Sequence, residues 1–230
     1  MAAAKRSVLR KSKSIAIAKG RRTQDEAKAE IVAVARDFLS THEFHKLTVG
    51  ALMQRTAIGR SAFYAYFTDV YELAAIFIEE VALGVEESIR GWLGDGSDPV
   101  KRVRVALKNA IAFWQSNGRL IQALEHAASQ DRRLQRLWRA EVAMRPVVLV
   151  ADTIRRDQAS GLIGPMDADQ ISSALNRFNM TYLNDSFAIE RPRDPAEVLK
   201  TLERVWLGTL YGEVSIAKLS KSHARLRASK

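Results

Sequence analysis

Apolar residues recur at helical spacing along almost the whole chain, and no segment shows the sustained alternation of a half-buried strand. Residues 23–40 begin with a threonine that is followed three positions later by Glu26, which is a capping pattern, and their apolar side chains share one face. Asp69 and Glu72 form a second capping pair and predict the start of a longer helix. The pattern therefore predicts an all-α protein of about nine helices.

Between these two helices the sequence predicts two short helices joined by a tight turn. The first starts at Thr48, and residues 57–59 separate it from a second helix over residues 60–67. A short helix, a three-residue turn with glycine and another short helix form the signature of a helix-turn-helix unit. Phe63 and Phe67 are four positions apart, so we expect both rings to pack inward.

The second helix of such a unit lies in the major groove of DNA. Small outward side chains let its backbone approach the bases, and tyrosine hydroxyls suit contacts to phosphates. An ordinary helical bundle with every ring in the core is the alternative, but one short amphipathic helix cannot bury four rings together. The residues that we expect to face outward are Arg60, Ser61, Ala62, Tyr64, Ala65 and Tyr66.

The rest of the chain predicts longer helices and forms a candidate effector half. Helical spacing and capping residues place them at residues 99–116, 120–128, 131–160 with a kink at Pro146, 167–189, and 195 to about 211. The predicted organisation is a basic arm (residues 1–22), a helix-turn-helix domain (residues 23–82), a ligand-binding and dimerisation domain (residues 83–213) and a basic tail (residues 214–230).

The segment from residue 23 to residue 81 resembles the DNA-binding domain of the TetR family of transcriptional regulators, on residues 47–69 in particular. Three positions depart from the family pattern: Ala57 replaces the usual turn glycine, Gly59 the usual serine cap, and Val70 a basic residue that contacts phosphate. The resemblance implies a homodimeric repressor on a near-palindromic double-stranded DNA operator. The predicted DNA contacts are Thr48, Arg60, Ser61, Ala62, Tyr64 and Tyr66, with Arg21 and Arg22 from the basic arm.

Residues 137–213 resemble the branch of this family that includes the ethionamide-resistance repressor, on segments such as 174–179 and 205–213. That resemblance implies a dimer through the last two helices and a tunnel for a hydrophobic small-molecule effector. Arg145 and Val148 stand where that repressor has rings, which implies a different preferred ligand. The residues implied to line the tunnel are Trp138, Asn176, Asn179, Leu183 and Trp206.

Spacing alone leaves the role of these polar and aromatic residues open. Asn176 and Asn179 could both face one enclosed space and orient a ligand. They equally fit a plain core in which each amide bonds to a neighbouring carbonyl, and spacing slightly favours that interpretation. Tryptophans are likewise more often core or interface residues than ligand walls.

The positive charge of the chain is concentrated at its two ends. The net charge is +10, from 36 lysines and arginines against 26 acids, and residues 1–22 hold eight basic residues without one acid. Residues 214–230 hold five more, again without an acid, so the middle is slightly acidic. Acid-free basic arms bind polyanions or remain solvated, and we expect the first arm to bind nucleic acid. A membrane-surface protein that uses residues 5–19 as an amphipathic helix is an alternative.

Little in the sequence points to chemistry. The chain has no cysteine, and His42 and His45 lack a third ligand for a metal site. We expect no catalytic residue, cofactor or metal, although a helical enzyme that uses the cavity is a second alternative. The apolar runs are too short to cross a membrane, so we expect a cytoplasmic protein without a membrane partner.

Overall fold

The computed structural model describes residues 24–93 and 98–228, with side chains described as far as residue 212. Within these ranges all regular structure is helical, which confirms the predicted all-α class. The basic arm, with Arg21 and Arg22, lies outside the described residues, and so do the side chains of the basic tail.

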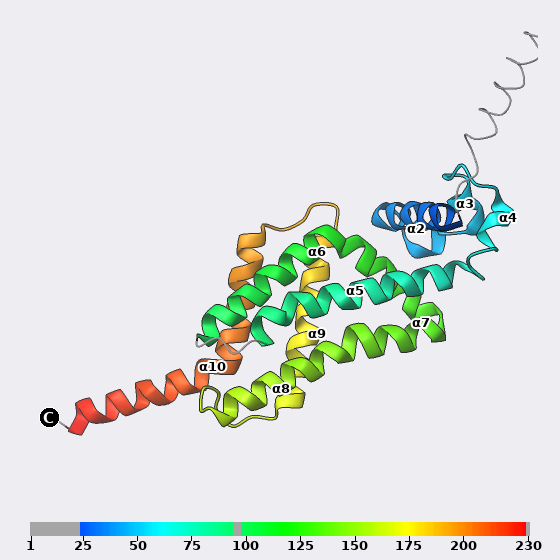
Figure 1. Ribbon diagram of the computed structural model, residues 1–230. Helices are drawn as coiled ribbons and strands as arrows, with labels where there is room; N and C mark the ends of the chain where they lie inside the picture. Colours follow the sequence, from blue (N-terminus) through cyan, green and yellow to red (C-terminus); the bar gives the residue numbers. More distant parts are fainter. Residues whose placement is uncertain (1–23, 94–97, 229–230) are drawn as a thin grey trace, which may run out of the picture.

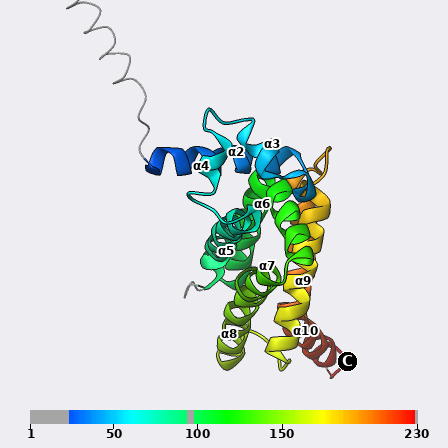
Figure 2. The ribbon, with the colours of Figure 1, turned by 90° about the vertical axis from the view of Figure 1, so that its right-hand side faces the viewer.

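A small head and a long body form the described part of the molecule (Figures 1 and 2). The head, α2 to α4, gathers at one end, and the last residues of α10 lie at the other. The elements in chain order are α2 (Gln24–Thr41), the short helix η1 (Phe44–Lys46), α3 (Val49–Met53), α4 (Arg60–Phe63), α5 (Val70–Leu93), α6 (Pro99–Gln130), α7 (Arg132–Leu137), the π-helical segment η2 (Trp138–Met144), α8 (Arg145–Ala159), α9 (Ala168–Phe187) and α10 (Pro195–Ala228).

Helix α5 belongs to both parts, because the expected boundary between residues 82 and 83 falls inside it. The predicted capping pair starts this helix. The Asp69 carboxylate accepts hydrogen bonds from the Tyr71 and Glu72 amides at 2.9 and 2.8 Å, and Glu72 reaches back to the Thr68 amide at 2.6 Å. These bonds satisfy the free amides of the first turn, so the chain leaves the head in a fixed direction.

Helix α6 is one continuous helix, and the prediction of two helices over residues 99–116 and 120–128 was wrong. Gly118 lies inside it and is buried against α9. A Cβ at this position would lie 3.1 Å from the Phe187 carbonyl carbon, so the glycine permits a close approach of backbones and does not end the helix. Close packing outweighs the weak local preference of glycine against helix.

Residues 131–160 differ from the single kinked helix that the sequence predicts. They form α7, the π-helical segment η2 and α8, and the irregular segment ends just before Pro146. Proline has no amide hydrogen, so a regular helix would leave one carbonyl of the preceding turn without its donor. The Arg145 amide donates to the Ala140 carbonyl, five residues back. This wider, π-helical turn accommodates the hydrogen-bond donor that Pro146 lacks.

The last helix is longer than predicted. Asp194 caps it as expected, accepting a hydrogen bond from the Ala196 amide at 2.9 Å. The helix then continues to Ala228, whereas the sequence predicted an end near Tyr211 and a separate tail.

A buried ion pair links four helices, α5, α6, α8 and α10, at the end of the body far from the head. The Arg102 guanidinium of α6 donates to both oxygens of Asp157 in α8, at 3.0 and 2.8 Å. The Tyr211 hydroxyl of α10 donates to the same carboxylate at 3.0 Å, and Arg102 also donates to the Trp92 carbonyl of α5 at 3.4 Å. Burial, together with the Asp157 charge, raises the pKa of Tyr211 to about 12, so this hydroxyl remains a donor at neutral pH.

We expect Asp157→Asn to lower the free energy of unfolding by about 3 kcal/mol, because it leaves the buried Arg102 guanidinium without its counter-charge. Urea unfolding followed by circular dichroism measures this loss. The exposed pair of Asp152 with Arg155 provides the control, and Asp152→Asn should change stability by less than about 0.5 kcal/mol. Equal effects of the two variants would contradict a structural role for the buried pair.

Candidate nucleic-acid interface and effector cavity

The helix-turn-helix unit is held by local caps and by one contact from α2. The Ala51 amide donates to the Thr48 hydroxyl at 3.1 Å and starts α3, as predicted. In the turn, the Ala57 amide donates to the Glu30 carboxylate of α2 at 3.0 Å. Positive φ angles occur among the described residues only at glycine Gly161, so this turn needs no glycine and accommodates Ala57.

The recognition segment is shorter as a regular helix than the predicted residues 60–67. Helix α4 covers Arg60–Phe63, and Gly59 precedes it in an extended conformation. The Tyr66 and Phe67 amides then both donate to the Phe63 carbonyl, at 3.0 and 2.9 Å, so the chain keeps a helical course through a tighter turn. The Phe63 and Phe67 rings are both buried, as predicted, with centroids 5.4 Å apart.

The exposed face of this segment carries most, but not all, of the residues expected there. Tyr64 is 58% exposed, and Arg60 and Ser61 are exposed beside it. Tyr66 and Ala62 are only half-buried, and the Tyr66 ring packs against the core, which corrects the expectation that it faces fully outward. Tyr66 follows Phe63 by three positions, so both side chains turn toward the same side of the helix.

The start of α5 is tied to the body by Arg133 of α7. Its guanidinium donates to Asp69 at 3.1 Å and to Asp131 at 3.0 Å. Partial burial alone would raise the pKa of Asp69, but hydrogen bonds from the Glu72 amide and from Arg133 outweigh it and lower this pKa. The hydrogen bond from Arg133 is the main cause that lowers the pKa of Asp131. Both carboxylates are therefore ionised at neutral pH and hold α7 beside the junction of head and body.

A small apolar cavity lies in the body. Its volume is about 20 Å³, room for little more than one water molecule. The Trp206 indole donates to the Asn179 side-chain oxygen at 2.8 Å, and the Trp206 ring meets Trp92 edge to face with centroids 5.4 Å apart. The residues that line this apolar cavity are Ile89, Trp92, Val103, Ala106, Leu107, Ala110, Asn179 and Trp206.

The structure brings only Asn179 and Trp206 of the expected tunnel residues into the lining of this cavity. Asn176 donates to the Ala143 carbonyl of η2 at 3.0 Å, as a plain core would require. Trp138 is buried in the same segment, and Leu183 is buried in α9. These three residues are not in the lining of the cavity in this conformation.

Sequence reasoning missed several residues of both sites. The α6 residues in the wall of the apolar cavity, such as Val103 and Leu107, lie on the apolar face of that helix. The sequence pattern therefore could not distinguish them from core residues. Glu30 and Arg133 contact residues that are 27 and 64 positions away, and nothing local to either residue indicates such a contact.

Two further expectations concern metal ions and membranes. No three His, Asp or Glu side chains gather to hold a metal ion in the part of the chain that the structure describes, and the His42 ring stacks on Phe38 at 4.4 Å. A search of the described helices finds none with the length and apolar character needed to cross a bilayer.

Comparisons with known proteins agree with this geometry. Residues 103–212 match the family model of the C-terminal domain of the transcriptional regulator EthR. The HTH-type transcriptional regulator EthR of Mycobacterium tuberculosis is 24% identical over 203 residues, which cover 85% of this chain and 94% of the relative.

Solved structures show the same fold. A bacterial regulatory protein of the TetR family from Rhodococcus RHA1 superposes with a TM-score of 0.68 at 13% identity, covering 80% of this chain and 97% of that one. AibR in complex with isovaleryl coenzyme A and operator DNA gives a TM-score of 0.60 at 13% identity, with 79% and 96% covered.

We expect Arg133→Gln to lower stability at about pH 7, and this loss to shrink as the pH falls below 3.8 and through the lowered pKa values of Asp69 and Asp131. A carboxylate whose pKa is lowered by folding stabilises the folded state above its unfolded value, and this contribution is lost as the pH falls through the folded pKa. Urea unfolding across this pH range measures the difference from wild type, with Arg136→Gln on the same helix as control. A difference that stays constant with pH would contradict the assigned role of Asp69 and Asp131.

Proposed function

We propose that this chain is a transcriptional regulator of the TetR family, a repressor that binds a near-palindromic operator as a homodimer and is released by a hydrophobic small molecule. The exposed face of the α4 segment at the end of the molecule is the observation that carries the proposal. The relatives are named as regulators, and the chain is a regulator rather than an enzyme. A regulator of this kind acts in the cytoplasm, where its operator is.

The α4 segment is proposed to enter the major groove. Arg60 and Ser61 lie at its start, near the base edges, and the Tyr64 hydroxyl extends toward the phosphates. A two-fold dimer presents two such segments, so the two half-sites are spaced by about one helical turn of DNA or a multiple of it. The proposed DNA contacts are Thr48, Arg60, Ser61, Ala62, Tyr64 and Tyr66, joined by Arg21 and Arg22 of the basic arm.

The dimer is proposed to form through α9 and α10. The Phe178 and Tyr182 rings of α9 stack with centroids 5.4 Å apart and are only half-buried in one chain. On α10, Gly208 is exposed, and a Cβ added there would meet no atom within 4 Å. Half-buried rings on one helix and an open surface on another are typical of faces that a second copy covers.

The effector is proposed to expand the apolar cavity. The present volume of about 20 Å³ is far below the several hundred that a drug-sized ligand needs, so binding must displace side chains. Trp206 and Trp92 are the large side chains in the wall, and Asn179 is its polar group. The tunnel proposed for the expanded state adds Trp138, Asn176 and Leu183 to these residues.

Release follows from a difference in affinity. A ligand that binds the expanded cavity favours the distance between the two heads of the dimer that goes with this expanded state. A dimer with that distance binds the operator less well. A helical enzyme and a membrane-surface protein were the alternatives from the sequence, and the named relatives favour neither.

We expect Arg60→Ala and Tyr64→Ala each to weaken operator binding about tenfold, because each removes a contact worth about 1–3 kcal/mol. Gel-shift titration measures the affinity, and sedimentation measures whether the dimer persists. Lys108→Ala, an exposed lysine of the body, is the matched control and should bind as wild type does. Wild-type affinity in both head variants would overturn the assignment of the recognition segment.

We expect Asn179→Leu to bind decanol more tightly than wild type does. In the wild type, a ligand that displaces Trp206 breaks its hydrogen bond to Asn179, which costs about 1 kcal/mol, or about a fivefold loss of affinity. The increase in melting temperature with decanol measures binding. Asn109→Ala on the exposed face of α6 is the control. Equal increases in melting temperature for wild type and Asn179→Leu, or no increase for either, would contradict the role of the cavity.

A further inference from the structure

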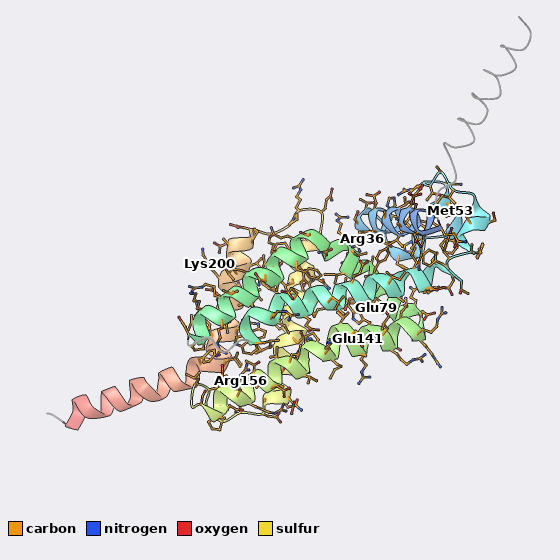
Figure 3. The ribbon with its side chains drawn as sticks, viewed as in Figure 1. Arg36, Met53, Glu79, Glu141, Arg156 and Lys200 are labelled. Atoms are coloured by element: carbon orange, nitrogen blue, oxygen red, sulfur yellow. The ribbon has the colours of Figure 1, made fainter. Side chains whose placement is uncertain are left out.

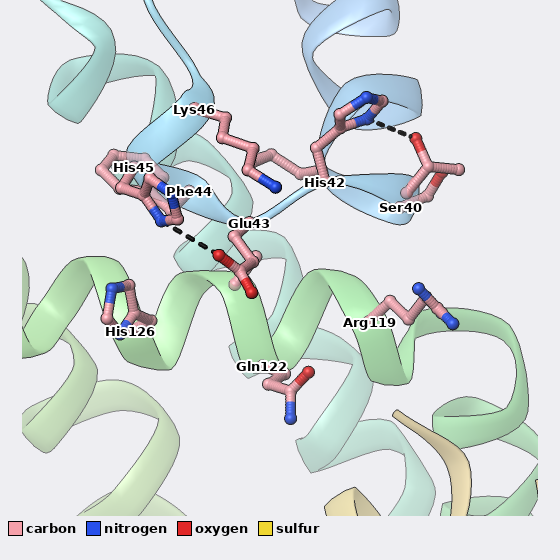
Figure 4. Close-up of a pocket in the computed structure, with 12 residues that line it drawn as sticks. Ser40, His42, Glu43, Phe44, His45, Lys46, Arg119, Gln122 and His126 are labelled. Atoms are coloured by element: carbon pink, nitrogen blue, oxygen red, sulfur yellow. Dashed lines mark hydrogen bonds and ion pairs between the residues drawn. The ribbon is translucent and has the colours of Figure 1, made fainter. Parts of the chain in front are cut away.

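A polar cleft lies between the head and the body and is distinct from the apolar cavity. It has a volume of about 610 Å³, within the range of small-molecule sites. One wall is the end of α2 with the loop and η1, residues 39–46, and the other is one face of α6 (Figure 4). The side chains of α6 that line this polar cleft are Arg119, Gln122, Ala123 and His126.

Positive charge dominates the polar cleft. Lys46 contributes an ammonium from the head wall, and Arg119 a guanidinium from the body wall. Neither has a carboxylate partner among the described residues. Glu43 is the one acid in the lining, and it pairs with the His45 ring at 3.1 Å. Two unpaired cations on opposite walls attract an anion that can reach both.

Imidazoles supply further donors in the same space. His45 from the head and His126 from α6 meet edge to face, with ring centroids 6.4 Å apart. His42 is held against the Thr41 hydroxyl at 2.8 Å and lines the cleft nearby. A neutral imidazole carries one N–H donor, and its protonated form carries two and a positive charge. The lining therefore offers cations and N–H donors from both walls.

We propose that the polar cleft binds a small multivalent oxyanion, a phosphorylated or polycarboxylate compound, between Lys46 and Arg119. In proteins, guanidinium and ammonium groups bind such oxyanions. Hydrogen bonds that involve a charged group are stronger than those between neutral groups. The apolar cavity offers only one polar side chain, Asn179, so the two sites select ligands of different chemistry.

Occupation of the polar cleft acts on the head. An anion held by Lys46 and Arg119 bridges η1 and α6 and restricts how the head turns relative to the body. Its affinity is therefore coupled to that of the operator, and the coupling is reciprocal. This step rests on the proposed function, whereas anion binding by itself does not.

Isothermal titration calorimetry with pyrophosphate, at constant ionic strength, tests the site. We expect Arg119→Gln and Lys46→Gln each to weaken pyrophosphate binding about tenfold or more. Lys108→Gln removes an equal charge from α6 outside the cleft, and Arg60→Gln removes one from the recognition segment. Both controls should bind pyrophosphate as wild type does, and any binding to the basic arm is common to all five proteins.

The outcomes separate the site from the function. Absence of pyrophosphate and citrate binding, or equal losses in the control variants, overturns the site. Preference for pyrophosphate over citrate identifies a phosphorylated ligand, and the reverse identifies a polycarboxylate. Operator affinity measured with and without the anion tests the coupling. An unchanged affinity overturns the coupling while the site remains, and failure of the wild type to bind any DNA overturns the proposed function instead.

Discussion

Helix α5 is fixed at both of its ends, and this constraint connects the head to the body. At its first turn, Asp69 caps the helix and accepts a hydrogen bond from Arg133 of α7. At its last turn, the Trp92 carbonyl accepts from Arg102 and the Leu93 carbonyl accepts from Arg156 at 3.0 Å. Figure 3 places Arg156 at the opposite end of the molecule from Met53 in the head. A displacement of either end is therefore transmitted along a rigid helix.

The buried ion pair defines geometry more than it adds stability. Burial of two charges costs solvation that their attraction only partly offsets, and apolar replacements of such pairs are often neutral or stabilising. Asp157 nevertheless joins α8 to α6 and α10, through Arg102 and Tyr211. Trp92 contributes its carbonyl to this cluster and its ring to the apolar cavity. A ligand that moves the Trp92 ring thus acts directly on the end of α5.

Helix α6 lines both of the sites. Its first half, with Val103 and Leu107, forms a wall of the apolar cavity, and its second half, with Arg119 and His126, forms a wall of the polar cleft. Because α6 is unbroken at Gly118, the two sites share one continuous helix. Under the two proposals, the effector of the apolar cavity acts on the far end of α5, and the anion of the polar cleft acts beside the head. The two proposed ligands, which differ in chemistry, therefore act through the same connecting helices.

Helical content, the capping of α5 by Asp69 and of α9 by Asp167, and the inward packing of Phe63 were determined by residues within one or two turns of each other. The sequence alone could therefore predict them, and with them the helix-turn-helix unit and most of its exposed face. The tertiary structure decided that Gly118 lies inside a continuous helix, that Tyr66 is half-buried, and that the apolar cavity is nearly closed. These features depend on contacts between segments far apart in the sequence, whose distances are set only when the helices pack.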